Sequence, residues 1–343
     1  NVSKMNYKKY IIALLCFPLV ACTPIKQSTI DTTLQTKVDS ILQNKMSEID
    51  AISGQAIVME VQTGEIKAMV GNGISQESGL IRTASLLAAL ETGKVKLSDT
   101  IDVGEGVYMV HNRELLDHNW HRGGYGKLTT LQGLMVNSHI ANYKNIERAF
   151  TEEQAYFDML NKMSYGQPEN IEGLDSLKPA HFVTPNDSGW NNTSLAWFCI
   201  GYNQQISPIQ MLTFYNAIAN DGKMVKPTLY KGETEVINPQ IASKANIDSL
   251  QMALVKVVTE GLGKPAQSEK VQVAGVSGGS QISTDEDNSE GKMNTIYAGE
   301  YCGYFPAENP KYSIIVSMNK IGLPASGGLM AGSVFKEIVD FIN

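Results

Sequence analysis

The sequence is short of positive charge. Its 343 residues contain 28 lysines and arginines against 35 aspartates and glutamates, and the formal net charge is −7. No cluster of basic residues lies beside aromatic ones, so nucleic-acid binding is disfavoured. Only 18% of the residues are charged and 43% are hydrophobic, a composition that can bury a full core and is not that of a disordered chain.

Long hydrophobic runs are also lacking. The apolar run 11–20 is too short to span a bilayer, but it follows two lysines and precedes small residues and Cys22, as in a secretory signal. The end of this run, Leu19-Val20-Ala21-Cys22, resembles a bacterial lipobox, which implies cleavage before Cys22 and lipid attachment to it. We therefore expect an exported lipoprotein of the cell envelope, on the periplasmic side of the inner or outer membrane. The alternative is an uncleaved anchor or a buried apolar helix.

Cysteine is scarce as well, with four in the chain. On the lipoprotein interpretation, Cys16 leaves with the signal and Cys22 carries lipid. Cys199 and Cys302 remain, both in apolar segments where buried free thiols are the commoner state. A bridge between them is the alternative in an exported protein.

The chain divides into three regions. We expect a signal peptide over 1–21, a lipid-anchored tether with one short amphipathic helix over 22–52, and a single domain over 53–343. The domain begins with two apolar runs around a turn, which predicts a hairpin. Helical patterns fill its middle, among them one over 128–150 and one that begins with Ser207 as N-cap and Pro208 in the first turn, and strand patterns return near its end. The fold class expected is α/β (α+β): an antiparallel sheet flanked by helices, with a mostly helical second lobe and a ligand cleft between the lobes.

Six segments, taken in order, resemble a known family. They read GQAIVMEVQTGEIKAMV, LLAALETGKVKLSDTIDVGEGVY, DHNWHRGGYGKLTTLQGLMVNS, SLAWFCIGYNQQISPIQMLTFYNAIANDGKMVKPTLY, YAGEYCGYFPAENPKYSIIVSMN and GLMAGSVFKEIVDFI. Together they resemble the transpeptidase domain of class B penicillin-binding proteins, the cell-division type related to FtsI. The resemblance covers the chain from Gly54 to its end and implies a serine β-lactamase/DD-transpeptidase fold.

The resemblance also implies a site made of three elements. A serine in S-x-x-K is acylated after the lysine one turn away takes its proton. An S-x-N element positions the substrate amide, and a K-T-G strand binds the substrate carboxylate. No metal or other cofactor takes part.

This sequence lacks the reactive groups of that site. Alignment from LAALETGK places Gly79 at the nucleophile and Arg82 at the base, and glycine offers no nucleophile while arginine stays protonated. Ser78 fits only by a slip of one residue, which puts Ile81 at the base position. The degenerate equivalents of the other two elements are Asn137, Ser138, His139, Val276, Ser277 and Gly278. The expected ligand cleft comprises Ser78, Arg82, Ser138, His139, Ser277, Gly278 and Gly279.

Three other S-x-x-K matches are weaker. Ser289 to Lys292 falls in a polar loop, and Ser317 and Lys320 point to opposite faces of a predicted strand. Ser333 and Lys336 begin the C-terminal helix, where Ser333 is expected to be an N-cap.

Two further segments of the sequence suggest a metal site and an anion site. His118, His121 and Asp117 suggest metal ligands, but their glycine-rich context indicates a loop without a third partner, and we expect no metal. Arg82 is interpreted as a solvated cation or a partner of Glu77. Its other possible role is to bind a carboxylate at the floor of the cleft.

The function expected is that of a catalytically inactive penicillin-binding-protein-like domain that acts by binding. Its ligand would be a peptidoglycan stem peptide, or its partners would be cell-wall synthesis or division proteins, with a lipid anchor in the membrane. Two alternatives stay open: an active DD-transpeptidase or carboxypeptidase with an atypical site, and a sensor that binds a β-lactam or muropeptide without acylation.

Overall fold

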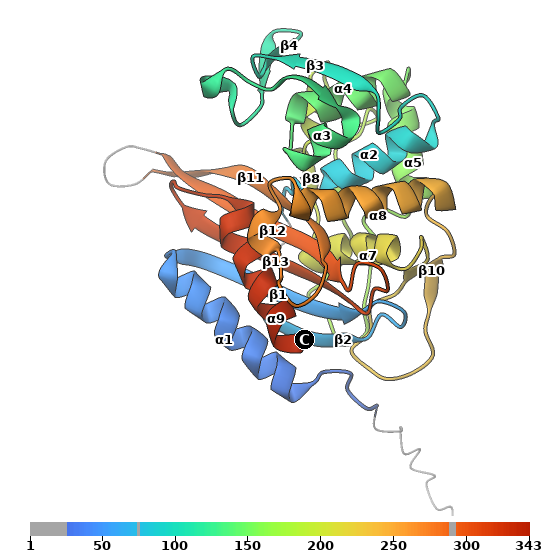
Figure 1. Ribbon diagram of the computed structural model, residues 1–343, viewed down its shortest axis with the longest axis vertical. Coiled ribbons are helices and arrows are strands. Elements are labelled where there is room, and N and C mark those ends of the chain that lie inside the picture. The colour runs from blue at the N-terminus through green and yellow to red at the C-terminus, as the bar shows by residue number, and fades with distance from the viewer. Residues whose placement is uncertain (1–25, 74–75, 288–292) are drawn as a thin grey trace, which may run out of the picture.

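The computed structural model describes residues 26–73, 76–287 and 293–343 (Figure 1). The predicted signal peptide 1–21 and the predicted lipidation site Cys22 lie outside these residues. Within them, no helix combines the length and the apolar character needed to cross a bilayer.

The centre of the molecule is a five-stranded antiparallel sheet in the order β11-β12-β13-β1-β2. The first two strands along the chain, β1 and β2, form the predicted hairpin. The strand β1 also pairs with β13, the last strand of the chain. The two ends of the domain therefore meet in one sheet, which confirms the expected fold class. The strands are β1 Ala51–Glu60, β2 Ile66–Gly71, β11 Ala274–Asp287, β12 Met293–Phe305 and β13 Tyr312–Ile321.

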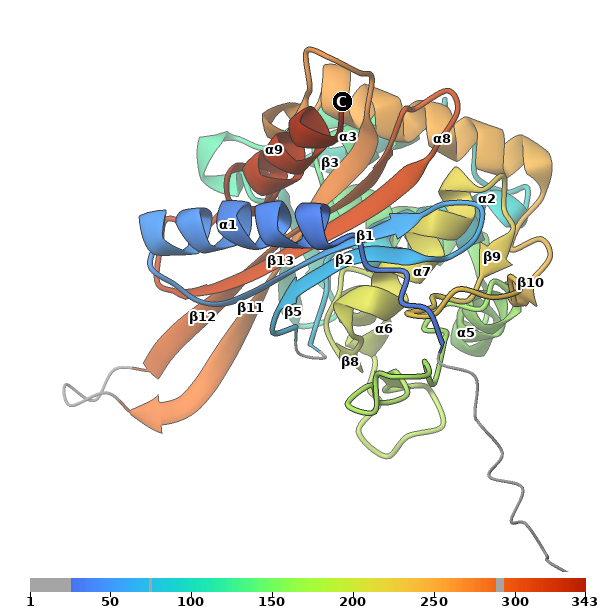
Figure 2. The same cartoon turned by 90° about the horizontal axis from the view of Figure 1, so that it is seen from below.

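Both faces of the sheet are covered, which explains the uninterrupted apolar run in β1. Successive side chains of a strand point to opposite faces. Ile57 and Met59 belong to an inner core between the sheet and the helical lobe, whereas Ala56 and Val58 belong to an outer core beneath α1 Thr32–Glu48 and α9 Ser333–Ile342. Figure 2 shows α1 and α9 on one side of the sheet and α7 Pro208–Ala219 on the other.

The helix α1 lies inside the region expected to be a tether. Its residues Leu34, Val38, Ile41 and Leu42 are spaced to fall on one face, and all four are buried in the outer core. This part of the region 22–52 is thus packed on the sheet.

The helical lobe lies above the sheet in Figure 1 and consists of short helices and small two-stranded sheets. Its helices, with α8 at its border, are α2 Ile81–Glu91, α3 Thr130–Met135, α4 His139–Ala149, α5 Glu153–Lys162, α6 Ser194–Phe198 and α8 Lys244–Thr259. The remaining strands are β3 Thr100–Gly104, β4 Val107–Val110, β5 Arg113–Leu116, β6 Gly126–Thr129, β7 His181–Phe182, β8 Gln204–Gln205, β9 Met224–Val225 and β10 Val236–Asn238. Single turns occur at Trp120–Arg122, Lys264–Ala266 and Gly328–Gly332.

Capping residues fix two helix starts that matter for the site. Ser207 caps α7 in a capping box with Gln210, and Pro208 takes the first helical position, as predicted. The stretch expected to be one helix over 128–150 is instead two, α3 and α4. Asn137 between them has φ 53°, and Ser138 caps α4 by accepting a hydrogen bond from the Ala141 amide.

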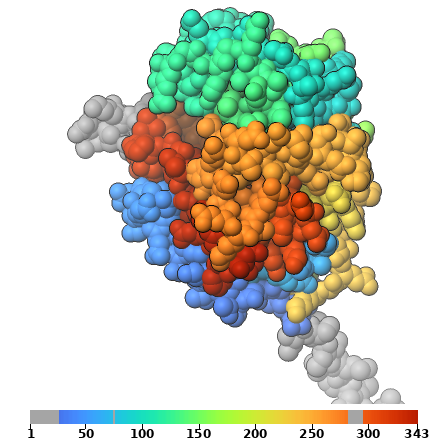
Figure 3. Space-filling model, in the orientation of Figure 1, coloured from blue at the N-terminus to red at the C-terminus, as the bar shows by residue number. Residues whose placement is uncertain are grey.

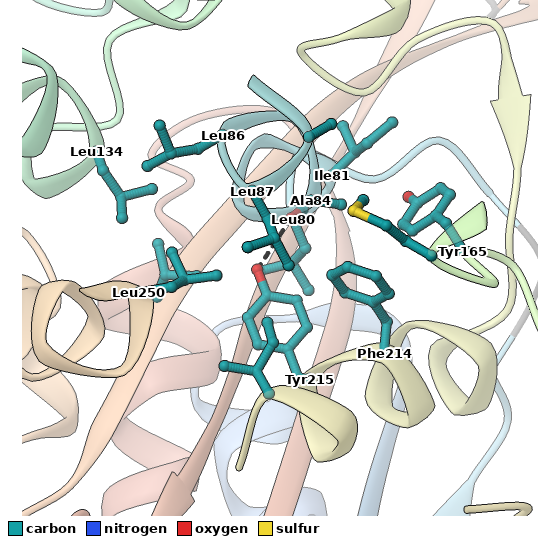
Figure 4. Close-up of a cluster of buried hydrophobic side chains, with 14 of the residues drawn as sticks. Leu80, Ile81, Ala84, Leu86, Leu87, Leu134, Tyr165, Phe214, Tyr215 and Leu250 are labelled. Carbon is teal, nitrogen blue, oxygen red and sulfur yellow. Dashed lines mark hydrogen bonds between the residues drawn. The ribbon is translucent and has the colours of Figure 1, made fainter. Parts of the chain in front are cut away.

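The helix α2 runs through the middle of the inner core (Figure 4). Its residues Ile81, Ala84 and Leu87 are buried, and Phe214 and Tyr215 of α7 pack beside them. The Tyr215 hydroxyl donates to the Leu80 carbonyl at 2.9 Å and is hydrogen-bonded to the Thr83 hydroxyl at 2.7 Å. These two bonds fix the start of α2 relative to α7.

Candidate functional site

The nucleophile position, Gly79, lies against the backbone of β11. A Cβ atom built on Gly79 would be 2.6 Å from the carbonyl oxygen of Gly279 and 2.9 Å from its nitrogen. Real Cβ atoms do not approach backbone atoms so closely, so any side chain at position 79 requires the strand to move.

Two further glycines lie in similarly close backbone contact with the residues on either side of Gly79. A Cβ on Gly278 would be 2.9 Å from the Leu80 amide nitrogen, and one on Gly201 would be 2.6 Å from the Ser78 carbonyl oxygen. Ser280 Oγ also donates to the Glu77 carbonyl at 2.8 Å. The edge of β11 is thus packed against the segment that leads into α2, where the resemblance implied a cleft.

The expected cleft residues are brought together but are mostly buried. Ser78 and Ser138 are each 1% exposed, Arg82 is 6% and Ser277 is 7% exposed. Gly278 is buried, His139 is partly buried, and only Gly279 is exposed. Figure 3 shows the helical lobe lying directly on α8 and the sheet.

Arg82, at the base position, is buried without a partner. Its Nε atom is enclosed and unbonded, and its guanidinium makes no hydrogen bond or ion pair with any described residue. Burial lowers the pKa of Arg82, while the nearby tyrosines 215 and 202 and the acids Glu300 and Asp117 act to raise it. The expected pair with Glu77 is not formed, because that carboxylate accepts from the Asn203 amide at 3.2 Å.

The second element holds the start of α4. Ser138 Oγ donates to Asp117 at 2.7 Å, and the same carboxylate accepts from the Ile140 amide at 3.1 Å. His139 Nδ1 lies 2.9 Å from the Leu116 carbonyl, and burial lowers the pKa of His139 to about 3, so the ring is neutral. The side chains of Asp117, Ser138 and His139 are thus all bonded to neighbouring parts of the protein.

The third element bonds directly to the second. Asn137 Nδ2 donates to the Ser277 carbonyl at 3.2 Å and to its Oγ at 3.1 Å. Val276, at the position of the lysine, is 3% exposed and belongs to the inner core. The two walls of the expected cleft are therefore joined by hydrogen bonds.

Glu300 was missed by the sequence reasoning. It lies on β12, is 2% exposed, and accepts a hydrogen bond from Ser78 Oγ at 2.6 Å. Burial raises the pKa of Glu300 to about 7, against the opposing effects of the Ser78 hydroxyl and of Arg82. The available signal was an acid inside the apolar strand YAGEYCGYF, since an acid in a buried strand needs a partner.

The two S-x-x-K matches within the described residues place no lysine beside a serine. Ser317 is buried on β13, while the Lys320 ammonium donates to the Pro324 carbonyl at 3.2 Å. The predicted N-cap role of Ser333 is wrong, because an unusual wide turn over 328–332 runs into α9 and the Ser333 hydroxyl donates back to the Leu329 and Met330 carbonyls. The match Ser289 to Lys292 lies outside the described residues.

The histidines and cysteines have structural surroundings. His118 contacts the Tyr125 hydroxyl at 3.0 Å, and no three metal-binding side chains gather anywhere in the described part of the chain. Cys199 and Cys302 are both buried free thiols. Burial raises the pKa of each thiol, so neither is an activated nucleophile.

The fold is that of a transpeptidase domain. Residues 54–340 match the family described as "Penicillin binding protein transpeptidase domain", and the chain belongs to this family. Within it, the chain is related to the class B proteins that include FtsI.

Curated relatives are distant. The chain is 24% identical to penicillin-binding protein PbpB of Mycolicibacterium smegmatis, over 92% of this chain and 54% of the relative. It is 22% identical to the peptidoglycan D,D-transpeptidase FtsI of Escherichia coli K12, over 89% of this chain and 53% of the relative. The chain thus spans about half the length of the curated relatives it matches.

Solved structures agree on the fold. The transpeptidase domain of Burkholderia pseudomallei penicillin-binding protein 3 matches with a TM-score of 0.77 at 22% identity, over 91% of this chain and 94% of that one. Penicillin-binding protein 3 of Mycobacterium tuberculosis, solved with aztreonam, matches with a TM-score of 0.76 at 20% identity, over 92% of this chain and 78% of that one.

Proposed function

We propose that this chain has lost acyl transfer and acts as a non-catalytic member of the peptidoglycan-synthesis or cell-division machinery. The observation that carries the proposal is the Gly79 contact: the position of the nucleophile holds a glycine, and Gly279 occupies the space that a side chain would need. An arginine that stays protonated stands at the position of the base.

A substitute nucleophile at Ser78 is the strongest rival. Its hydroxyl already donates to Glu300, and a carboxylate with a pKa near 7 could accept the proton. Both side chains are almost fully enclosed, however, and the Gly201 and Gly278 backbones cover the segment 78–80. A substrate carbonyl cannot approach the Ser78 oxygen in this arrangement, so we assign the pair a structural role.

The close packing of the expected cleft also limits the size of the ligand that it can hold. The cavity beside Arg82 and Ser138 measures about 10 Å³, which is room for about one water. Neither a stem peptide nor a β-lactam fits there. We therefore favour cell-wall synthesis or division proteins as partners over a peptide held in the closed cleft.

The proposed function also includes a lipid anchor at the N-terminus. The N-terminal signal over 1–21 and lipidation at Cys22 would tether the domain to the periplasmic side of the inner or outer membrane. The functional unit would then be the region 53–343 together with the packed helix α1.

The first experiment is intact-protein mass spectrometry after incubation with a reactive penicillin, with E. coli FtsI as the positive control. We expect no mass increase for this protein while FtsI gains one ligand mass. An adduct would contradict the proposal, and the Ser78→Ala and Ser138→Ala variants would identify its site.

A second experiment tests the partner. Cross-linking in intact cells, followed by identification of the captured species, should recover peptidoglycan-synthesis or division proteins. Capture of muropeptides without such proteins would favour the stem-peptide alternative.

A further inference from the structure

A small cavity lies between α2, α3 and α4. Its volume is about 10 Å³, and its wall includes Arg82 and Leu86 of α2, Leu134 of α3, and Asn142 and Asn145 of α4. A space of this size holds about one particle as large as a water molecule.

One N–H donor of the wall, Arg82 Nε, is buried and has no hydrogen-bond partner. The Arg82 guanidinium has no bonded partner among the described residues, and neither does the Asn145 Nδ2 group. Asn142 Nδ2 donates to the Cys199 carbonyl at 2.8 Å, which uses one of its two N–H bonds. Buried donors without acceptors are costly, and a buried cation without a bonded anion is more so.

The nearby acids are not placed to satisfy Arg82. Asp117 accepts from Ser138 and the Ile140 amide, and Glu300 accepts from Ser78. Neither carboxylate lines the cavity or makes an ion pair with the guanidinium within the described chain. They lower the energy of the cation at a distance but leave its Nε–H group without an acceptor.

We propose that this cavity binds a single halide ion, chloride under ordinary conditions, through the N–H groups of Arg82, Asn142 and Asn145. The volume excludes carboxylate, phosphate and sulfate, which need room for several heavy atoms. A water could instead bridge Arg82 to Asn137 Oδ1, which is also buried and unbonded, but it would carry no compensating charge. The site is independent of the proposed loss of acyl transfer, since it concerns only how Arg82 is stabilised.

Bromide replaces chloride and can be located by its anomalous scattering. Crystals grown in sodium bromide should show one anomalous peak inside the cavity, and crystals of the Arg82→Met variant should show none there. Ordinary water density without an anomalous signal in the wild-type cavity would overturn the proposal.

Solution stability provides the second readout. A ligand that binds only the folded state raises the unfolding midpoint with its concentration. The wild-type midpoint should rise with chloride or bromide at constant ionic strength, with gluconate as the replacement anion. A bromide peak without any such dependence would mean binding at crystal concentration only, and would also overturn the proposal.

Variants on α4 separate the site from general salt effects. Asn145→Asp places a carboxylate in the cavity as a built-in anion, so this variant should fold without showing the halide dependence. Arg148→Met is the matched control, because Arg148 is an exposed cation of the same helix that pairs with Asp99 at 3.1 Å. It should keep the full halide response, and equal loss in both variants would count against the site.

Discussion

Gly79 and Gly279 lie backbone to backbone, and the expected nucleophile position leaves no room for a side chain: a Cβ on Gly79 would be 2.6 Å from the Gly279 carbonyl oxygen. Gly278 makes a similar approach to Leu80. If the catalytic serine has been lost as proposed, the strand β11 now occupies its place. Substitutions that put catalytic residues back at these positions would therefore also require β11 to move away from Gly79.

The first prediction concerns Gly79→Ser. We expect a loss of about 1–3 kcal/mol in the free energy of unfolding, because the new side chain overpacks a contact with rigid backbone. Urea denaturation measures this loss. The control is Gly189→Ser, since Gly189 is exposed and has nothing within 4 Å of its Cβ position, and its effect should stay within about 0.5 kcal/mol. Equal effects at the two glycines would show that the contact at position 79 is not tight.

The second prediction concerns Gly79→Ser combined with Arg82→Lys, which restores the residue types of S-x-x-K. We expect no acylation by penicillin, since Val276 still replaces the lysine of the third element and Ser138 remains bonded to Asp117. Intact-protein mass spectrometry gives the answer. A stable adduct in the folded double variant would mean that the closure opens readily.

Much of the fold could be predicted because it depends on local patterns. The apolar runs on either side of a turn predicted the β1–β2 hairpin, and the Ser207-Pro208 start predicted α7. The break between α3 and α4 could not be read in the same way. It depends on the left-handed Asn137, and the helical periodicity continues on both sides of it.

The sequence predicted which residues stand at the expected site, but not the close packing around them. Gly79, Arg82 and Val276 could be placed by counting along the chain. Gly201 and Glu300 reach the same place from distant segments, and no sequence spacing relates either of them to Ser78. Their roles depend on tertiary packing, in particular on the register that brings Glu300 of β12 opposite Gly278 of β11.

The third prediction compares two buried tyrosines. Tyr215→Phe removes hydrogen bonds to the Leu80 carbonyl and to Thr83, and should cost about 1–3 kcal/mol because these groups stay buried. The Tyr304 hydroxyl is buried without a partner, so Tyr304→Phe should be neutral or stabilising. Denaturant unfolding of both variants tests the pair, and a larger loss for Tyr304→Phe would contradict the hydrogen-bond assignment.

The last prediction is a pH dependence that comes from Glu300. Burial raises the pKa of Glu300 from 4.5 to about 7 in the folded protein, so the folded state binds more protons than the unfolded state between these values. Its contribution to stability is therefore fully present below the unfolded pKa and is lost as the pH rises through about 7. The difference corresponds to about 3 kcal/mol, as an order of magnitude.

The variant Glu300→Gln isolates this effect, because glutamine stays neutral and can still accept from Ser78. His139 works in the opposite direction, since burial lowers its pKa to about 3 and stability is lost as the pH falls below the unfolded value of 6.5. That contribution is common to both proteins and cancels in the comparison. We expect Glu300→Gln to be more stable than the wild type near pH 8, and its advantage to shrink as the pH falls toward about 5. Unfolding free energies measured in urea across this range provide the test, and a constant difference between the two proteins would show that Glu300 does not titrate there.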